Sequence, residues 1–308
     1  MVQAANVFVL VLLWFSAASV NVISAKIILS ELHGYAWVLT FFQLVVSLVC
    51  GRLYVGKTKP LTKVQRRITF GAGFSTWIGL VFTNQGFNYM NSSLVETIKA
   101  AEPAAGTIIG AFFTKEGWPS FPILRSLAIV VVGVMLASWS DASFALLGVL
   151  ATVLANFFFS CSNVFSKMNH EQDEPLDGMI YWHCDVCYGL CFATICALPE
   201  LHRLFATVET LQLRALAPIT LLNGLAFWTY NACICLITKH VNFSTFLVLN
   251  TMRRATLIIS SLMYFGIEMS MPNILGLGIA AIGFLVFLGQ KKKEQKVSSA
   301  AEDNDKHA

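Results

Sequence analysis

Residues 243–265 read FSTFLVLNTMRRATLIISSLMYF, an apolar run with two adjacent arginines, Arg253 and Arg254, at its middle. A run of this length crosses the roughly 30 Å hydrocarbon core of a bilayer as a helix. Each arginine at the centre of such a helix costs about 2.5–3.5 kcal/mol on insertion scales. The stretch from Phe243 to Gly266 holds no acidic residue that could offset this cost. It therefore predicts a membrane-spanning helix whose arginines face water, a partner or a ligand.

The composition of the whole chain agrees with a membrane protein. The 308 residues are 56% hydrophobic and 12% charged, and the mean hydropathy is +0.67. Soluble domains carry roughly a quarter charged residues, so this chain is too apolar to be a pair of soluble domains. The net charge of +4 is modest, and no long basic run indicates a nucleic-acid partner.

Segments of about 20 apolar residues recur along the chain and predict an all-α polytopic membrane protein with ten transmembrane helices. The expected spans are residues 5–29, 35–55, 68–90, 92–114, 120–139, 144–167, 178–198, 216–238, 242–265 and 271–290. Residues 201–215 alternate leucine with polar residues and are expected to form a short helix on the membrane surface. Residues 291–308 are expected to be a disordered tail.

Lysine and arginine are distributed unequally between the links that join these spans. One side of the predicted membrane holds Lys57, Lys59, Lys63, Arg66, Arg67, Lys115, Lys167, Lys239 and the tail residues Lys291, Lys292, Lys293, Lys296 and Lys306. The other side holds Arg203 and Arg214. Because basic links stay cytosolic, we expect both termini in the cytosol.

The two halves of the chain share short motifs in the same order. The first predicted span ends in Asn21-Val-Ile-Ser-Ala-Lys26, and the sixth ends in Asn163-Val-Phe-Ser-Lys167. The fourth and ninth spans are each followed by a proline that opens the next. We therefore predict a first five-helix repeat in residues 1–140 and a second in 141–290. An odd number of spans per repeat inverts the second copy, as in many secondary transporters.

The fourth predicted span also carries charge near its middle, at Lys99. If the repeats are inverted, Lys99 and the arginine pair lie at similar depth across one cavity and form an anion site. Glu96 and Glu102 lie three residues either side of Lys99 on one helix face, so an ion pair within that helix is the alternative. One arginine is expected to face the cavity, and the other a neighbouring helix or the vestibule. Tyr230 and Asn231 are polar residues in an apolar run and could complete the site.

Four motifs together resemble the triose-phosphate translocator family. Thr97-Ile-Lys-Ala-Ala-Glu-Pro103 resembles its T-I-K-A-x-E-P, and Asn250-Thr-Met-Arg-Arg254 resembles its G-N-x-x-K-R. Tyr230-Asn231 falls where the family has Y-N, and the stretch ending at Lys167 resembles its R-N-x-x-S-K. The likeness covers the whole chain and extends to the drug/metabolite transporter superfamily. It implies ten helices in two inverted repeats.

The resemblance also implies roles for individual residues. Lys99, Arg253, Arg254 and Tyr230 would bind phosphate, and Thr83 stands where the family has a threonine that contacts the substrate. Asn231, Glu102 and Leu80 are further possible contacts. This sequence departs from the family at Leu80, where plastid members have a histidine that contacts phosphate. It departs again at Arg253 in place of lysine, and at Glu96 in place of histidine.

The function expected from these features is antiport of a phosphorylated sugar or other small organic phosphate against inorganic phosphate. The alternative is a nucleotide-sugar/nucleoside-monophosphate antiporter of the Golgi or endoplasmic reticulum, because a nucleotide sugar also carries phosphate. An enzyme is not expected, because the chain shows no nucleophile paired with a base. Cys184 and Cys187 have a CxxC spacing that stands alone, so we expect neither a metal nor a cofactor.

The remaining expectations concern partners and location. The predicted partners are small-molecule phosphates and the lipid bilayer, with no nucleic acid, for a chain that is a monomer or a homodimer. No cleavable transit peptide is visible before the first apolar run. This favours a multi-pass protein of Golgi or endoplasmic-reticulum endomembranes, or of an outer plastid-type membrane.

Overall fold

The computed structural model describes residues 2–306 except 33, 58–59, 114–117, 140, 142, 209 and 242. Lys59 and Lys115 therefore lie outside the described residues, as do the side chains of residues 292–308. The described residues form helices and no strand. The helices are α1 (Val2–Glu31), α2 (Ala36–Val55), α3 (Lys63–Tyr89), α4 (Ser92–Lys99), α5 (Glu102–Phe113), α6 (Phe121–Trp139), α7 (Leu146–His170), α8 (Gly178–Thr207), α9 (Thr210–Ile237), α10 (Phe243–Phe265) and α11 (Met271–Lys306).

The helices have the length and surface of a multi-pass membrane protein. Seven of them within the described residues, α1, α2, α6, α7, α8, α9 and α11, are long and apolar enough to cross a bilayer. Large apolar side chains such as Leu53, Phe121 and Met263 are more than three-quarters exposed, as expected where lipid is the solvent. The helices outside this set, α3, α4, α5 and α10, carry most of the charged candidate site residues.

The predicted fourth span is two helices, because the chain breaks at Ala100 and Ala101 between α4 and α5. Pro103 has no N–H, so the carbonyl of Lys99 loses its intrahelical donor. The backbone tightens there, with the Ala101 N–H donating to the Ile98 carbonyl at 3.1 Å. Asn156 of α7 donates to the same carbonyl at 3.0 Å. The break thus has a covalent cause and a polar partner on a neighbouring helix.

Two other expectations were wrong. Residues 201–215 do not form a separate surface helix, because Leu201–Thr207 continue α8 and residues 210–215 begin α9. Residues 291–306, expected to be disordered, are helical as the end of α11. A helix already nucleated by the apolar part of α11 needs only propagation, and the lysine, glutamate, glutamine and alanine that follow are good helix formers.

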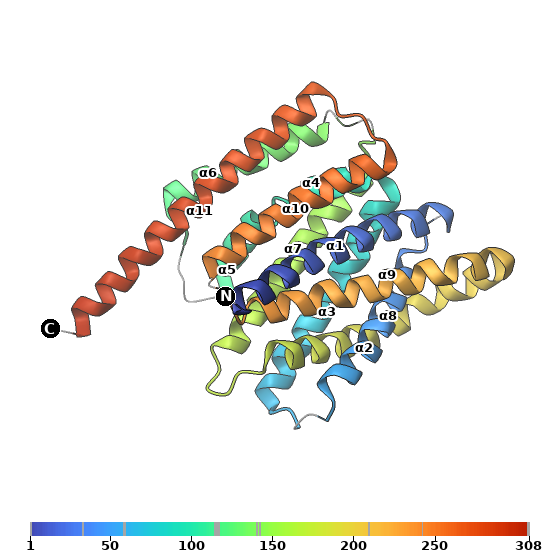
Figure 1. Ribbon diagram of the computed structural model, residues 1–308, viewed down its shortest axis with the longest axis horizontal. Coiled ribbons are helices and arrows are strands. Elements are labelled where there is room, and N and C mark those ends of the chain that lie inside the picture. The colour runs from blue at the N-terminus through green and yellow to red at the C-terminus, as the bar shows by residue number, and fades with distance from the viewer. Residues whose placement is uncertain are drawn as a thin grey trace.

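The helices form one bundle in which the two chain ends lie on the same side (Figure 1). α6 and α11 run side by side along one edge, and α2, α8 and α9 lie at the opposite edge (Figure 1). α3 packs against α7, and α1 packs against α9. Lys26 near the end of α1 donates to the carbonyls of Phe87 and Met90 at 2.6 and 2.9 Å, which ties α1 to the C-terminus of α3.

Small residues let α6 and α11 approach closely. A Cβ atom built on Gly133 would lie 2.4 Å from the backbone nitrogen of Ala280, and one built on Gly276 would lie 2.4 Å from that of Ala137. No side chain larger than hydrogen fits at either glycine without moving backbone. Contacts of this kind between small residues stabilise helix association in lipid, because moving an apolar side chain from lipid into a helix interface gains little free energy by itself.

Candidate anion site

A cavity of about 160 Å³ lies inside the bundle, between helices of both halves of the chain. All eight site residues named from the sequence line it: Leu80, Thr83, Lys99, Glu102, Tyr230, Asn231, Arg253 and Arg254. The expectation that Lys99 and the arginine pair lie across one cavity agrees with this placement. The break between α4 and α5 brings Lys99 and Glu102 to opposite sides of a non-helical joint at the cavity wall.

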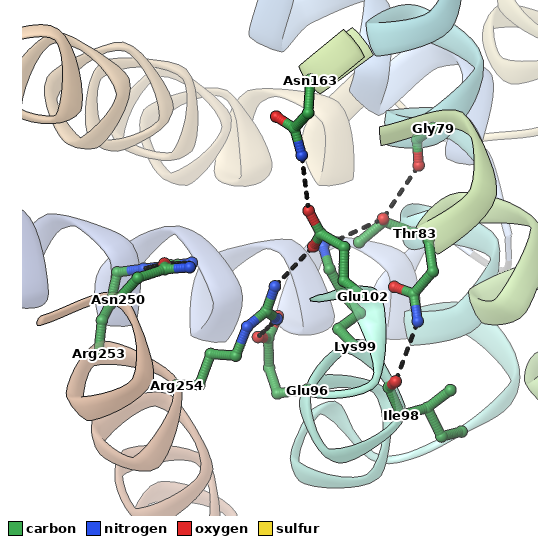
Figure 2. A network of polar contacts seen from close by, with 11 residues as sticks. Gly79, Thr83, Glu96, Ile98, Lys99, Glu102, Asn163, Asn250, Arg253 and Arg254 are labelled. Atoms are coloured by element: carbon green, nitrogen blue, oxygen red, sulfur yellow. Dashed lines mark hydrogen bonds and ion pairs between the residues drawn. The ribbon is translucent and has the colours of Figure 1, made fainter. Parts of the chain in front are cut away.

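Arg254 has two carboxylate partners on other helices, so of the surroundings expected for the arginines it has a partner. Its Nη2 lies 2.6 Å from Oε2 of Glu102, and its Nη1 lies 3.7 Å from Oε2 of Glu96 (Figure 2). The helix of Arg254 holds no acidic residue, and both partners come from the broken fourth span. The sequence of α10 alone therefore could not predict these ion pairs. Arg254 is 8% exposed, and its buried Nη1 makes no hydrogen bond within the described residues.

Lys99 contacts neutral groups. Its Nζ donates to Oγ1 of Thr83 at 3.3 Å, and it lies 4.9 Å from the ring centroid of Phe159. The Thr83 hydroxyl itself donates to the carbonyl of Gly79, so it accepts from Lys99 (Figure 2). Of the described carboxylates, none lies within ion-pair distance of Lys99, so the alternative of an ion pair within the fourth span is wrong.

Arg253 lines the same cavity, so both arginines face it. Its Nε and Nη2 donate to Oδ1 of Asn250 at 3.2 and 2.9 Å. Its guanidinium lies over the ring of Trp14 on α1, 5.4 Å from the centroid. One arginine was expected to face the cavity and the other a neighbouring helix or the vestibule. Arg253 instead does both, because it lines the cavity and also contacts α1.

The charges on the cavity wall are partly balanced. Three cations, Lys99, Arg253 and Arg254, and two carboxylates, Glu96 and Glu102, give it a formal charge of +1. Glu102 also accepts from Nδ2 of Asn163 on α7 at 3.3 Å. Asn163 is exposed, so Glu102 has a hydrogen-bond partner at the surface of the bundle. The arrangement can hold an anion if Arg254 exchanges its carboxylate partner for the ligand.

Two amide side chains that the sequence interpretation did not assign to the site, Gln43 and Asn84, also line the cavity and belong to a hydrogen-bonded network. Gln43 donates to Oδ1 of Asn223 at 2.9 Å, and Asn84 donates to Oε1 of Gln43 at 3.2 Å. Asn223 in turn donates to the carbonyl of Asn21 and to Oγ of Ser24. This amide network joins α1, α2, α3 and α9. Polar amides within the apolar runs FFQLVV and LLNGLAF were the available signal.

Comparisons with known proteins identify a family that this chain resembles along nearly its whole length. The model of the Triose-phosphate Transporter family matches residues 5–288. A phosphoenolpyruvate/phosphate translocator of Oryza sativa subsp. japonica is 29% identical over 86% of this chain and 69% of its own length. A xylulose 5-phosphate/phosphate translocator of Arabidopsis thaliana is 26% identical over 92% and 70%.

A third relative is a glucose-6-phosphate/phosphate translocator of Arabidopsis thaliana, 23% identical over 91% of this chain and 73% of its own length. A solved crystal structure of another protein covers 92% of this chain and 95% of its own, with a TM-score of 0.53 and 16% identity. That likeness concerns the fold alone.

Proposed function

We propose a transport function for this chain, which belongs to the Triose-phosphate Transporter family. It acts as a secondary-active antiporter that exchanges a phosphorylated sugar or another small organic phosphate for inorganic phosphate. Its relatives are named as translocators of phosphoenolpyruvate, xylulose 5-phosphate and glucose 6-phosphate, each against phosphate. Phosphate is the part that all these ligands share, so it is the group that the site must recognise.

One observation carries the proposal: a buried guanidinium with an unused donor faces a cavity that also holds Arg253 and Lys99. Nη1 of Arg254 makes no hydrogen bond within the described part of the chain. A guanidinium binds two phosphate oxygens at once, and a lysine adds a compact charge. Tyr230, Asn231 and Thr83 supply further polar groups on the same wall. A phosphate ester placed here would satisfy donors that the protein leaves open.

The proposed architecture is two inverted five-helix repeats, and the helix contacts support it. If α1–α6 and α7–α11 are equivalent, with α4 and α5 together matching α10, the main contacts between the two halves have counterparts. The contact of α3 with α7 corresponds to that of α9 with α1, and α3 with α8 corresponds to α9 with α2. In the same way α5 with α7 corresponds to α10 with α1. Alternating access then follows from movement of one repeat against the other.

The proposed mechanism uses the ion pair between the halves. Glu102 belongs to the first half and Arg254 to the second, and their contact balances the arginine when the cavity holds no ligand. An incoming phosphate competes with Glu102 for Arg254 and leaves Glu102 on Asn163. The ligand then bridges Lys99 and Arg254 in place of the carboxylate, so that the halves close around it. The proposed orientation has both termini in the cytosol, in an endomembrane of the Golgi or endoplasmic reticulum or an outer plastid-type membrane.

The test is uptake into liposomes that contain the purified chain and are preloaded with phosphate. Phosphate, triose phosphates, phosphoenolpyruvate, pentose and hexose phosphates and nucleotide sugars are offered in turn. We expect uptake of phosphate and of at least one small organic phosphate, and its loss in Lys99→Ala. Lys239→Ala, outside the cavity, is the control that should retain uptake. Uptake of nucleotide sugars alone, or unchanged uptake in Lys99→Ala, would contradict the proposal.

A further inference from the structure

Glu96 is the less tightly held of the two carboxylates that line the cavity. It is 3% exposed and lines the cavity, and its contact is with Nη1 of Arg254 at 3.7 Å, too long for a hydrogen bond. Glu102, by comparison, accepts from Arg254 at 2.6 Å and from Asn163 at 3.3 Å. Figure 2 shows both carboxylates converging on Arg254 from the two helices of the broken span.

The charge of the cavity does not match a phosphate dianion. Its formal charge of +1 becomes −1 when a dianion binds with all five groups ionised. A net charge inside the membrane is costly, and two anions that share Arg254 repel each other. Binding would also draw Nη1 of Arg254 toward the phosphate and remove the contact that Glu96 has. One proton in the occupied site would bring the total charge to zero.

We propose that Glu96 binds this proton when a dianionic phosphate occupies the cavity, and so sets the ionic state of the ligand that the site accepts. The proposal rests on the proposed function. A proton from water joins one carboxylate oxygen of Glu96, with no change in oxidation state. The neutral carboxyl then has an O–H donor for a phosphate oxygen, where the carboxylate had only acceptors. When the ligand leaves, the proton returns to water.

The other charged and titratable groups of the cavity are less well placed than Glu96 to bind this proton. The charged and titratable groups on the cavity wall are Lys99 from α4, Glu102 from α5, Tyr230 from α9, and Arg253 and Arg254 from α10. The arginines keep their charge at all relevant pH values. Glu102 keeps the hydrogen bond from Asn163 when the phosphate replaces it on Arg254, whereas Glu96 is then left without a charged partner. α1, α2, α3 and α7 contribute neutral lining residues such as Gln43, Asn84 and Phe159.

The test counts the protons taken up when inorganic phosphate binds. Isothermal titration calorimetry of the full chain in detergent, at about pH 8 in buffers of different ionisation enthalpy, gives this number directly. We expect about one proton per bound phosphate for the wild type and about none per bound phosphate for Glu96→Gln. Asp185→Asn is the matched control, because Asp185 is an equally buried carboxylate that does not line the cavity. It should leave the proton count unchanged.

Equal proton uptake in Glu96→Gln and wild type, or none in the wild type, would overturn the proposal. Failure of the wild type to bind phosphate at all would instead refute the proposed function. If Glu96→Gln does not fold, the pH profile of Glu96→Asp decides. The wild-type affinity should fall by up to about tenfold per pH unit on its alkaline limb. Glu96→Asp must move that limb, and an unmoved limb would overturn the assignment.

Discussion

The two adjacent arginines differ in what holds them. Arg253 is fixed by Asn250 on its own helix and by the ring of Trp14. Arg254 is shared between Glu102 and Glu96, which both come from the other half of the chain. An anion can compete for Arg254 without breaking the structure of α10 itself. The geometry therefore gives Arg254 the exchangeable contact and Arg253 a fixed charge beside it.

Arg254→Lys keeps the charge and removes the planar fork. Because hydrogen bonds to charged groups contribute about 1.5–3 kcal/mol, we expect phosphate affinity to fall roughly tenfold or more. Arg253→Lys is the matched control at the neighbouring position, and we expect a smaller loss there. Phosphate titration of both variants by calorimetry makes the comparison. Equal losses in the two variants would contradict the separate roles.

The sequence could predict which residues meet, but not which of them pair. Lys99 and the arginines were placed on one cavity because inverted repeats would bring the fourth and ninth spans to similar depth across it. The partners of Arg254 could not be found in the same way. Glu102 lies 152 positions away in sequence, and only the packing of α5 and α10 around the cavity brings the two groups together.

At the scale of the helices, a count of apolar residues does not detect the break in the fourth predicted span. Residues 92–114 are apolar enough to predict one continuous span, yet Pro103 ends the hydrogen-bond pattern of α4 and starts α5. The available signal was Pro103, which directly follows Glu102 and lies four residues after Lys99. Boundaries elsewhere were predicted closely, because loops between spans carry charges, glycine and proline. The extents of α8, α9 and α11 were not, because helices can continue past the membrane.

The α6–α11 contact can be tested with the same substitution at two glycines of one helix. In Gly276→Ala, the new methyl group meets the backbone of Ala137, whereas at Gly278 nothing lies within 4 Å. We expect Gly276→Ala to lower the free energy of unfolding by about 1–3 kcal/mol, as overpacking does. Gly278→Ala should be neutral or slightly stabilising. Thermal unfolding in detergent measures both, and equal melting temperatures would contradict the close approach.

The start of α8 depends on one carboxylate outside the spans. Asp177 accepts from the backbone N–H of Met179 as the N-cap of α8, and it pairs with Lys239. The hydrogen bond from Lys239 lowers the pKa of Asp177 below its usual value. Its contribution to stability is therefore present above about pH 3.9, the ordinary pKa of aspartate, and is lost as the pH falls through the lowered value.

Asp177→Ala should cost about 1 kcal/mol of stability at neutral pH, mainly through loss of the cap, since exposed ion pairs contribute little. The difference from wild type should shrink in strong acid. Melting temperatures of both proteins from about pH 7 downward test this, with Lys239→Ala as the control that keeps the cap. A difference that does not change with pH would show that the carboxylate charge has no part in it.

At the scale of the whole molecule, the cavity lies between the two halves of the chain, and the two helices of the broken span, α4 and α5, pack against different helices around it. α4 packs against α10, whereas α5 packs against α7 and α6. The contact between α5 and α10 at the cavity is the ion pair of Glu102 with Arg254. An ion pair that a ligand can replace suits a joint that opens and closes, and a ligand that completes the site makes closure depend on cargo. In the proposed mechanism, this dependence is the physical basis for exchange instead of one-way leak.

Trans-stimulation tests this claim most directly. Uptake of labelled phosphate is measured in liposomes that contain the chain, either empty or preloaded with unlabelled phosphate. The account predicts fast uptake into loaded liposomes, little into empty ones, and loss of the difference in Arg254→Ala. Equal uptake into empty and loaded liposomes, or undiminished exchange in Arg254→Ala, would contradict it.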